Sequence, residues 1–539
     1  MSDERLGNTS EHPDVVVVGA GFAGLYMVHR LVSNGFDVVG IERGSDVGGT
    51  WYWNRYPGAR CDVESMEYSY SFSEELQQEW DWSERYSSQS EILRYVNHVA
   101  DRFDLRRHYR FDTSVIGARF DDRWNGWTVM TATGKSVRCR YLVLAVGCLS
   151  TPHTPDVDRL SRFEGETYHT GTWPHRSVEF AGKRVAVIGT GSSGVQAIPL
   201  IAVEAASLTV FQRTPNYTVP AHNRRLGKDE LDWTKANYSE LRAANRRMQA
   251  ALGAGFGRPS KSVFESTRHE REARFGECWD KGGFGFLSAF NDLLLNQTSN
   301  DYAARYIRTR IREVVKDPEV AESLMPDSVV GCKRLCIDTG YYETFNRANV
   351  SLVDVRKTPI ERFTTTGIVA EGLEHTVDAV VFATGFDAMT GSLLAMDIVG
   401  TARKRLRDHW EAGPRTYLGL AVSGFPNMFT ICGPGSPSVL TNMLMSIEQH
   451  VEWISDFMKF MQHYSWNRVE AQCEAETQWG ARVNAIADLT LYPNCNSWYL
   501  GANIPGKPRT FMPYFGFPSY CQECEAVVED GYRGFTLRR

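Results

Sequence analysis

The sequence lacks a strong basic surplus and any apolar run long enough to cross a bilayer. Its 539 residues hold 59 Lys and Arg against 65 Asp and Glu, for a formal net charge of -6. Nucleic-acid binders usually carry a basic surplus, so we expect small-molecule partners and no nucleic acid. The polar opening MSDERLGNTSEHPD has no basic segment followed by an apolar one, so we expect no signal peptide, no membrane contact and a cytoplasmic location.

Cysteine is present, but without a metal-binding or disulfide pattern. The 11 cysteines are scattered, which is not typical of a secreted disulfide framework, so we expect mostly buried thiols. Cys521 and Cys524 form one CxxC pair. Cys332 and Cys336 form one CxxxC pair. Zinc needs four ligands and no second pair lies at zinc-finger spacing, so the sequence predicts no metal site and we assign these cysteines no role.

A strand, glycine loop and helix occur twice, about a third of the chain apart. The first copy has a β-branched strand over 15–18, a helix that ends at Gly35 and a strand over 37–42. The second copy has strands over 184–188 and 208–213. Such glycines let a pyrophosphate approach the free N–H groups at the helix start, so we favour dinucleotide binding over an ordinary turn. The two GxGxxG loops contain Gly19, Gly21 and Gly24, and Gly189, Gly191 and Gly194.

The residues at the ends of the second strands distinguish the two dinucleotides. Glu42 ends the first, where a carboxylate accepts hydrogen bonds from a ribose 2′-OH and repels a 2′-phosphate, which suits FAD. Arg213 and Thr214 end the second, where a cation and a hydroxyl suit the 2′-phosphate of NADPH rather than NADH. Arg213 as an ordinary surface arginine is the weaker interpretation.

The sequence predicts an α/β fold with two Rossmann-like dinucleotide-binding domains, one for FAD and one for NADPH, and an inserted helical subdomain. Strands over 141–145 and 379–383 end in glycine-bearing segments that resemble domain crossings in two-dinucleotide oxidoreductases. From 386 onward we expect strands and turns. We place the FAD-binding domain at 1–147 and 386–539, with a control loop near 485–508, the NADPH-binding domain at 148–218 and 334–385, and the helical insertion at 219–333.

A family resemblance begins with FEGETYHTGTWP, from Phe163 to Pro174. This segment matches the FxGxxxHxxxWP fingerprint of Baeyer–Villiger monooxygenases, whereas related flavin monooxygenases usually end it in Tyr or Phe. The resemblance covers nearly the whole chain and looks like the steroid and phenylacetone monooxygenase branch. It is carried by GGTWYWNRYPGARCDVES, VIGTGSSG, VFQRTP, KRL, ATGFDAMTG, GPGSPSVLTNM and SWYLGANIPGKP.

The resemblance implies an FAD- and NADPH-dependent enzyme that inserts one oxygen atom of O2 beside a ketone carbonyl through a C4a-peroxyflavin. Bulky aryl, cyclic or steroid-like ketones would become esters or lactones, and sulfides would be oxidised as well. The nearest alternative is an N-hydroxylating or sulfur-oxidising flavin monooxygenase, against which Trp173 and Lys333-Arg334 argue. A disulfide reductase needs a redox cysteine pair after the flavin glycines, where only Cys61 occurs. A non-catalytic flavoprotein is expected to lack the arginine at position 334, which this sequence has.

Site roles follow from the same resemblance. Arg334 is the permanent cation beside the reacting oxygen atoms, and Asp62 positions it near the flavin and nicotinamide. Lys333 joins Arg213 at the 2′-phosphate, and for His169 we favour packing or interdomain coupling over proton transfer. Trp51 and Trp53 could equally be core aromatics. Residues assigned to FAD are Ala23, Gly49, Thr50, Trp51, Tyr52, Trp53, Tyr68, Val115 and Met443; those assigned to NADPH are Arg60, Ser192, Ser193, Gln196, Thr214 and Trp498.

Overall fold

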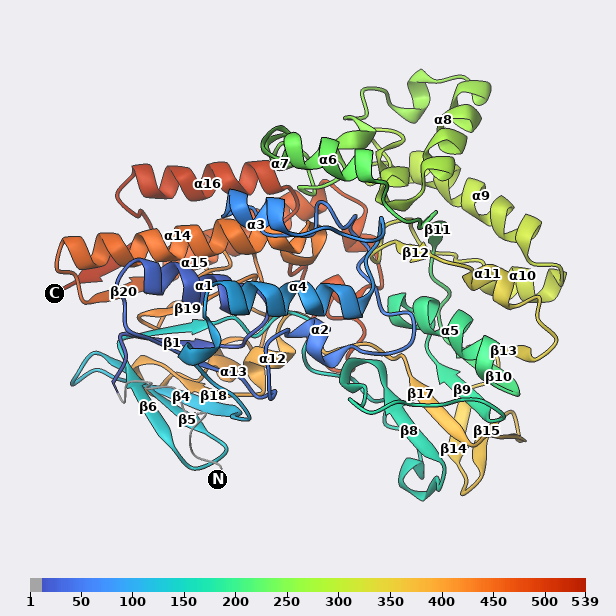
Figure 1. Ribbon diagram of the computed structural model, residues 1–539, viewed down its shortest axis with the longest axis horizontal. Helices are drawn as coiled ribbons and strands as arrows, with labels where there is room; N and C mark the ends of the chain where they lie inside the picture. Colours follow the sequence, from blue (N-terminus) through green and yellow to red (C-terminus); the bar gives the residue numbers. More distant parts are fainter. Residues whose placement is uncertain (1–11) are drawn as a thin grey trace.

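The computed structural model describes residues 12–539, which form two parallel five-stranded sheets and a helical insertion (Figure 1). Most of the polar opening on which we predicted no signal peptide lies outside this range. Within residues 12–539, no helix has both the length and the apolar character needed to span a membrane.

The first parallel sheet has the strand order β19-β7-β1-β2-β3. The central strands are apolar and completely buried, as expected for a parallel sheet covered on both faces. Helix α1 (Phe22–Ser33) packs against α14 (Met443–His463), so segments from both ends of the chain lie together here. The strands are β1 (Val15–Val18), β2 (Val38–Ile41), β3 (Tyr109–Arg110), β7 (Tyr141–Leu144) and β19 (Met428–Thr430).

The second parallel sheet repeats this plan in the order β13-β10-β9-β17-β8. Helix α5 (Ser192–Glu204) follows its glycine loop, as α1 follows the first. The edge strand β8 belongs to the fingerprint segment, a pairing that the motif alone did not predict. The strands are β8 (Glu166–His169), β9 (Arg184–Ile188), β10 (Ser207–Gln212), β13 (Val350–Asp354) and β17 (Ala379–Phe382).

The third glycine of each loop shows why the two copies share one sequence pattern. A β-carbon at Gly24 would lie 1.8 Å from the carbonyl oxygen of Gly19. A β-carbon at Gly194 would lie 2.3 Å from the carbonyl oxygen of Gly189. Only glycine lets each helix pack this closely on its strand, which is the role of the third glycine in a dinucleotide-binding loop.

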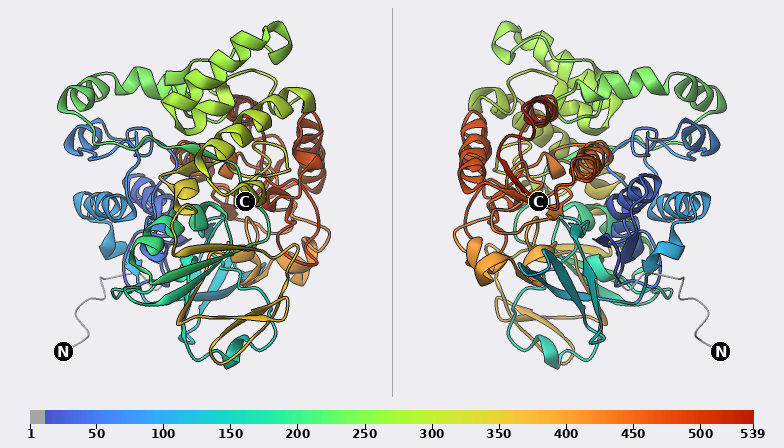
Figure 2. Two further views of the ribbon diagram at one scale, coloured as in Figure 1. Left: turned by 90° about the vertical axis from the view of Figure 1, so that its right-hand side faces the viewer. Right: turned by 90° about the vertical axis from the view of Figure 1, so that its left-hand side faces the viewer.

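The helical insertion leaves and rejoins the second domain at one place. There β11 (Thr218–Pro220) pairs in parallel with β12 (Cys336–Asp338), and Lys333-Arg334 lies directly before β12. The insertion contains α6 (Lys228–Ala236), α7 (Tyr238–Arg246), α8 (Arg268–Lys281), α9 (Gln297–Val314) and α10 (Pro318–Leu324). Helices α6 to α8, drawn in green, lie at the top of the molecule in both views of Figure 2.

The prediction of strands and turns from 386 onward is partly wrong, because long helices dominate this part. Helix α14 buries 13 of its 21 residues, and its buried apolar residues recur every three to four positions, as in a helix that packs on the core. Helices α15 (Cys473–Asp488) and α16 (Phe517–Glu529) follow it. The strands of this part are short and include, besides β19, β18 (Asp397–Val399), β20 (Arg468–Ala471) and β21 (Phe535–Arg538).

Smaller elements complete the two dinucleotide-binding domains. The order β18-β4-β5-β6 forms a four-stranded sheet beside the first domain, with β4 (Val115–Asp121), β5 (Gly126–Thr131) and β6 (Ser136–Cys139). An antiparallel sheet in the second domain contains β14 (Ile360–Phe363), β15 (Gly367–Ala370) and β16 (Leu373–Thr376). Short helix α2 (Thr50–Trp53) follows the first dinucleotide loop, and α3 (Glu74–Glu79) and α4 (Gln89–Arg102) flank the first sheet.

Cys332 corrects the expectation that the cysteines have no structural pairing. It forms a disulfide with Cys495, not with Cys336, and the two Cα atoms are 5.6 Å apart. The partners are separated by 163 residues, so no local spacing could reveal the pair. Most of the remaining cysteines are buried free thiols, as predicted.

Candidate active site

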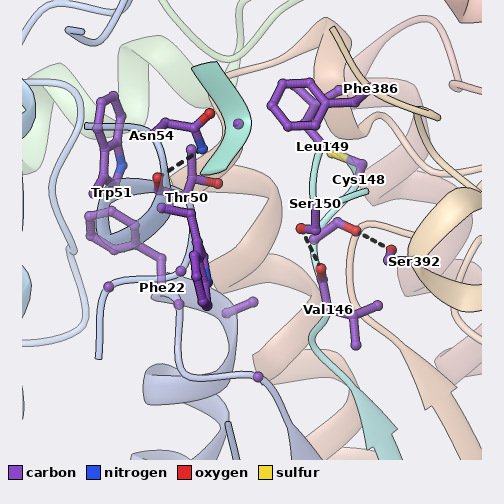
Figure 3. Close-up of a pocket in the computed structure, with 18 of the residues that line it drawn as sticks. Phe22, Thr50, Trp51, Asn54, Val146, Cys148, Leu149, Ser150, Phe386 and Ser392 are labelled. Carbon is purple, nitrogen blue, oxygen red and sulfur yellow. Dashed lines mark hydrogen bonds between the residues drawn. The ribbon is translucent and has the colours of Figure 1, made fainter. Parts of the chain in front are cut away.

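A cavity of about 520 Å³ lies between the two dinucleotide-binding domains, with walls from both glycine-loop regions. In Figure 3, Trp51, Thr50 and Asn54 lie on one side of it, opposite Phe386 and Cys148. Eighteen of the predicted site residues line it: Gly19, Gly21, Ala23, Glu42, Gly49, Thr50, Trp51, Trp53, Arg60, Asp62, Tyr68, Val115, Ser192, Ser193, Gln196, Arg334, Met443 and Trp498.

The other predicted residues lie outside the cavity wall. Tyr52 points away, and its hydroxyl accepts a hydrogen bond from the Ser45 N–H at 3.1 Å. Gly24 and Gly194 act through the close packing of helix on strand. The residues outside the wall are Gly24, Tyr52, Gly189, Gly191, Gly194, Arg213, Thr214 and Lys333.

The FAD end of the cavity has the features of a pyrophosphate cradle. Gly21 caps α1 without any side-chain hydrogen bond, so the first N–H groups of the helix have no capping side chain. Gly49 has φ of 53°, and a β-carbon there would lie 2.7 Å from the Gly21 Cα. A side chain at Gly49 would therefore fill the space where a phosphate could reach the helix N-terminus, and these residues fit FAD.

Glu42 is held rigidly at the end of β2. Its two carboxylate oxygens accept hydrogen bonds from the N–H groups of Gly44 at 2.7 Å and Ala20 at 2.8 Å, and the side chain is buried. Each carboxylate oxygen has a further lone pair, so a ribose hydroxyl can still donate to it. This position agrees with the predicted role of Glu42 in FAD binding.

Two cations without a paired acid belong to the NADPH site that the sequence predicts, outside the cavity wall. Arg213 is exposed and Lys333 half-buried, and among residues 12–539 neither forms an ion pair with a carboxylate. Burial, and then the neighbouring charge of Arg213, lowers the pKa of Lys333. A β-carbon at Gly191 would meet nothing within 4 Å, which leaves open space at the start of α5. A dinucleotide with a 2′-phosphate supplies the anion that both cations lack.

Arg334 and Asp62 form the charged centre of the cavity. Arg334 Nε donates to Asp62 Oδ2 at 2.6 Å, and Nη2 donates to Oδ1 at 3.0 Å. Nη1 donates to the Val439 carbonyl at 2.7 Å, and the guanidinium lies 4.7 Å from the Phe284 ring centre. Burial acts to lower the pKa of Arg334, but the Asp62 carboxylate outweighs it and the net shift is upward, so the arginine stays charged.

These contacts leave Arg334 with unused donors. A guanidinium has five N–H groups, and the bonds to Asp62 and Val439 use three of them. The other two can bind oxygen atoms that come to the cavity. A fixed cation with free donors in a largely buried site is the arrangement that stabilises negative charge as it develops on oxygen.

The fingerprint segment connects the domains. Trp173 N–H donates to the Trp53 carbonyl at 3.1 Å, which joins this segment to the first domain. His169 Nδ1 accepts from the Gly171 N–H at 2.9 Å, and Nε2 lies 3.3 Å from both the His153 carbonyl and the Thr384 hydroxyl. Burial lowers the pKa of His169, so the ring is neutral near pH 7. These contacts favour coupling or packing for His169.

The predicted control loop reaches the cavity through Trp498. This residue opens a short 3-10 helix, Trp498–Leu500, and Ser497 caps that helix. Farther along, the Asn503 side chain donates to the Phe386 carbonyl at 2.8 Å. Lys507 Nζ binds Asp387 Oδ1 at 2.5 Å and the Ala388 carbonyl at 2.7 Å. The loop is therefore attached to the cavity wall beyond Trp498.

The prediction missed several polar and aromatic residues of the cavity wall. The Asn54 side chain donates to the Thr50 carbonyl at 2.9 Å, and the Ser392 hydroxyl donates to the Gly147 carbonyl at 2.8 Å (Figure 3). Phe386 also lines the cavity. Asn54 and Phe386 each lie in a segment that carries the family resemblance, which was a usable signal. Ser392 follows directly after the same segment as Phe386, but a single serine before an apolar run gave no signal of its own.

The fold and the cavity define a two-dinucleotide flavoprotein oxidoreductase, and comparisons with known proteins agree. Residues 16–229 match the family model described as pyridine nucleotide-disulphide oxidoreductase. A solved structure described as OTEMO in complex with FAD and NADP has a TM-score of 0.94 and 41% identity, and the match covers 97% of this chain and 99% of that one.

Within that class the similarity is more specific. A Baeyer–Villiger monooxygenase of Pseudooceanicola batsensis is 44% identical over 531 residues, which are 98% of this chain and 96% of the relative. A solved oxidised steroid monooxygenase bound to NADP is 50% identical with a TM-score of 0.93, and the match covers 98% of this chain and 99% of that one. The chain belongs to the Baeyer–Villiger monooxygenases, FAD- and NADPH-dependent flavin monooxygenases.

One relative has a different named reaction. The phenazine N-monooxygenase PhzNO1 of Lysobacter antibioticus is 40% identical over 537 residues, 99% of this chain and 98% of the relative. Overall similarity at this level therefore does not separate ketone oxidation from nitrogen oxidation.

Proposed function

We propose that this enzyme oxidises bulky aryl, cyclic or steroid-like ketones to esters or lactones with NADPH and O2. The Arg334–Asp62 pair carries the proposal, because it fixes a cation with two free donors inside the cavity. The similarity to a steroid monooxygenase supports a bulky substrate. The flavin, when bound, activates O2 and supplies the transferred oxygen atom. A cytoplasmic location stays a prediction.

The residues of the chain have separable tasks in this proposal. Arg334 stabilises the negative charge that develops on oxygen, and it cannot quench that charge because a guanidinium does not give up its proton near pH 7. Asp62 offsets the cost of the buried charge and fixes the guanidinium plane. Arg213 and Lys333 bind the 2′-phosphate, and Trp498 covers the cavity and excludes water.

Products from a panel of ketones test the proposal. The purified enzyme is incubated with NADPH, O2 and each ketone, and NADPH consumption is compared with the mass of the product. We expect a product with one more oxygen atom, in which isotopically labelled O2 supplies that atom. NADPH consumption with every ketone unchanged and peroxide as the sole product would contradict the proposal.

Nitrogen oxidation is the second candidate, because of the phenazine N-monooxygenase relative. An aromatic nitrogen heterocycle and an aryl sulfide belong in the same panel. Nitrogen attacks the electrophilic end of an activated oxygen, so it does not need a cation to stabilise a carbonyl oxyanion. N-oxide formation that survives Arg334→Ala, without any ester in the parent enzyme, would favour this candidate.

A further inference from the structure

The Cys332–Cys495 disulfide joins two segments of the active site. Cys332 precedes Lys333 and Arg334, and Cys495 lies three residues before Trp498 in the control loop. Both cysteines are 2% exposed, and their Cα separation of 5.6 Å lies within the usual range for a disulfide. The disulfide therefore connects the loop that covers the cavity to the segment that carries its cation.

Neighbouring contacts hold the Cys495 segment in place while the loop lies against the cavity. The Leu491 N–H donates to the Leu294 carbonyl at 2.9 Å, and Arg509 Nη2 donates to the Cys495 carbonyl at 2.8 Å. A loop that opens must separate these two cysteines, and a disulfide between them must keep it closed.

We propose that Cys332 and Cys495 form a redox-sensitive tether that fixes the control loop over the bound nicotinamide dinucleotide. The oxidant is hydrogen peroxide, which oxygen-activating flavoproteins release when NADPH oxidation is not coupled to oxygen insertion. With the loop open, one thiolate attacks peroxide, its O–O bond breaks, and a sulfenic acid and water form. As the loop closes, the second thiol displaces a second water and the S–S bond forms. Two thiols are oxidised and one peroxide is reduced to two waters.

With the disulfide formed, the enzyme would turn over more slowly and the cavity would stay closed. A closed loop retains NADP+ and keeps water from the cavity, but NADP+ release requires opening. Both sulfurs are buried once the loop is closed, so small thiols would reduce the disulfide slowly. Peroxide would therefore slow the enzyme that produces it, and a strong reductant would restore it. This inference rests on the proposed function only for the source of the peroxide.

The first test is chemical and needs no ketone. The FAD-loaded enzyme is treated with hydrogen peroxide or with a phosphine reductant, free thiols are alkylated, and peptides are separated without reduction. We expect a peptide pair linked through Cys332 and Cys495 after peroxide and two alkylated peptides after reductant. Absence of the linked pair, or its persistence in fully reduced and unfolded protein, would overturn the redox tether.

The second test measures NADP+ release by stopped flow in the oxidised and reduced forms. We expect release from the oxidised enzyme to be several-fold slower, and Cys332→Ser and Cys495→Ser to release NADP+ equally in both forms. Cys473→Ser is the matched control, because Cys473 is exposed and free and this variant should respond like the parent. Equal release from both parent forms would overturn the proposal.

Two alternatives keep the test valid if the serine variants fold poorly. Cys495→Ala and Cys332→Ala keep the small volume of the site, and alkylation of the reduced parent gives the same loss of pairing without any substitution. Peroxide sensitivity that survives in these variants would contradict the tether. NADP+ release and the linked peptide do not depend on ester formation, so failure of the proposed ketone oxidation would leave both readouts intact.

Discussion

At the residue scale, two cations form no ion pair with a carboxylate among residues 12–539. Arg213 and Lys333 lie near each other, and the pKa of Lys333 is lowered first by burial and then by that neighbour. Two adjacent cations destabilise the free protein slightly, so their presence indicates an anionic ligand. Arg334 differs, because Asp62 already neutralises it and still leaves two donors unused.

The first residue-scale prediction concerns cofactor choice. Arg213→Ala should raise the KM for NADPH roughly tenfold or more, because a hydrogen bond to a charged group contributes about 1.5–3 kcal/mol. The KM for NADH should change little, since NADH has no 2′-phosphate. Steady-state kinetics with both cofactors measures this, and Arg268→Ala on the insertion surface is the control. Equal changes for both cofactors would remove the assignment.

The second residue-scale prediction concerns the pH dependence of NADP+ affinity. The lowered pKa of Lys333 means that its charge is lost at lower pH than for an ordinary lysine. Affinity for NADP+ should therefore be full below this pKa and weaken as pH rises through it, whereas NAD+ affinity should not follow. Titration calorimetry across the alkaline range measures both affinities. Lys333→Arg keeps its charge and should remove the dependence; an unchanged pH profile in this variant would assign the effect to another group.

At the scale of elements, the control loop has two separate attachments. Lys507 binds Asp387 and the Ala388 carbonyl at one end, and Cys495 lies against Cys332 at the other. Trp498 lies between them on the cavity wall. The loop is therefore held on both sides of the residue that we propose covers the nicotinamide.

Trp498→Ala should increase the peroxide released per NADPH consumed, because water then reaches the cavity during the oxygenated stage. Lys507→Ala should also increase the peroxide released per NADPH, but by less, since the loop keeps its other contacts. Peroxide and product are quantified in the same reaction, and Trp233→Ala serves as control because Trp233 is 59% exposed on the insertion. Unchanged coupling in Trp498→Ala would leave that residue with a packing role only.

The helices and strands also show how much of the fold could be predicted from the sequence. The paired glycine loops predicted β1-α1-β2, β9 and β10 to within a residue or two, and a helix without bounds where α5 lies, because a glycine-rich turn marks both the end of the strand before it and the start of the helix after it. The fingerprint did not reveal that β8 extends the second sheet, since a four-residue edge strand has almost no pattern. Helix α14 was missed although buried apolar residues recur along it every three to four positions, which was a usable signal.

At the scale of the whole molecule, the site is assembled from parts that are distant in sequence. The Trp173 N–H bond to Trp53 joins the domains on one side of the cavity. Gln196 joins them again, because its side chain donates to the Arg60 carbonyl at 3.1 Å and accepts from the Tyr56 hydroxyl at 2.8 Å. The resemblance could name such residues individually. It could not show that Cys332 meets Cys495, because that contact depends on how the insertion and the control loop fold together.

The central claim is that Arg334 is required for oxygen insertion but not for the chemistry of hydride transfer. Arg334→Ala and Arg334→Lys are therefore compared with the parent in two measurements. Anaerobic stopped flow follows flavin reduction by NADPH, and aerobic turnover is scored for ester. Arg334→Lys keeps a charge but lacks the planar fork that serves Asp62 and a second oxygen together.

We predict that flavin reduction survives in Arg334→Ala, although more slowly. Ester formation should fall by at least roughly 100-fold to 1000-fold, the cost of losing one oxyanion-hole donor, because a full charge is lost here. Arg334→Lys should retain only part of the parental ester formation. An Arg334→Ala enzyme that reduces its flavin and still forms ester at nearly the parental rate would contradict the account.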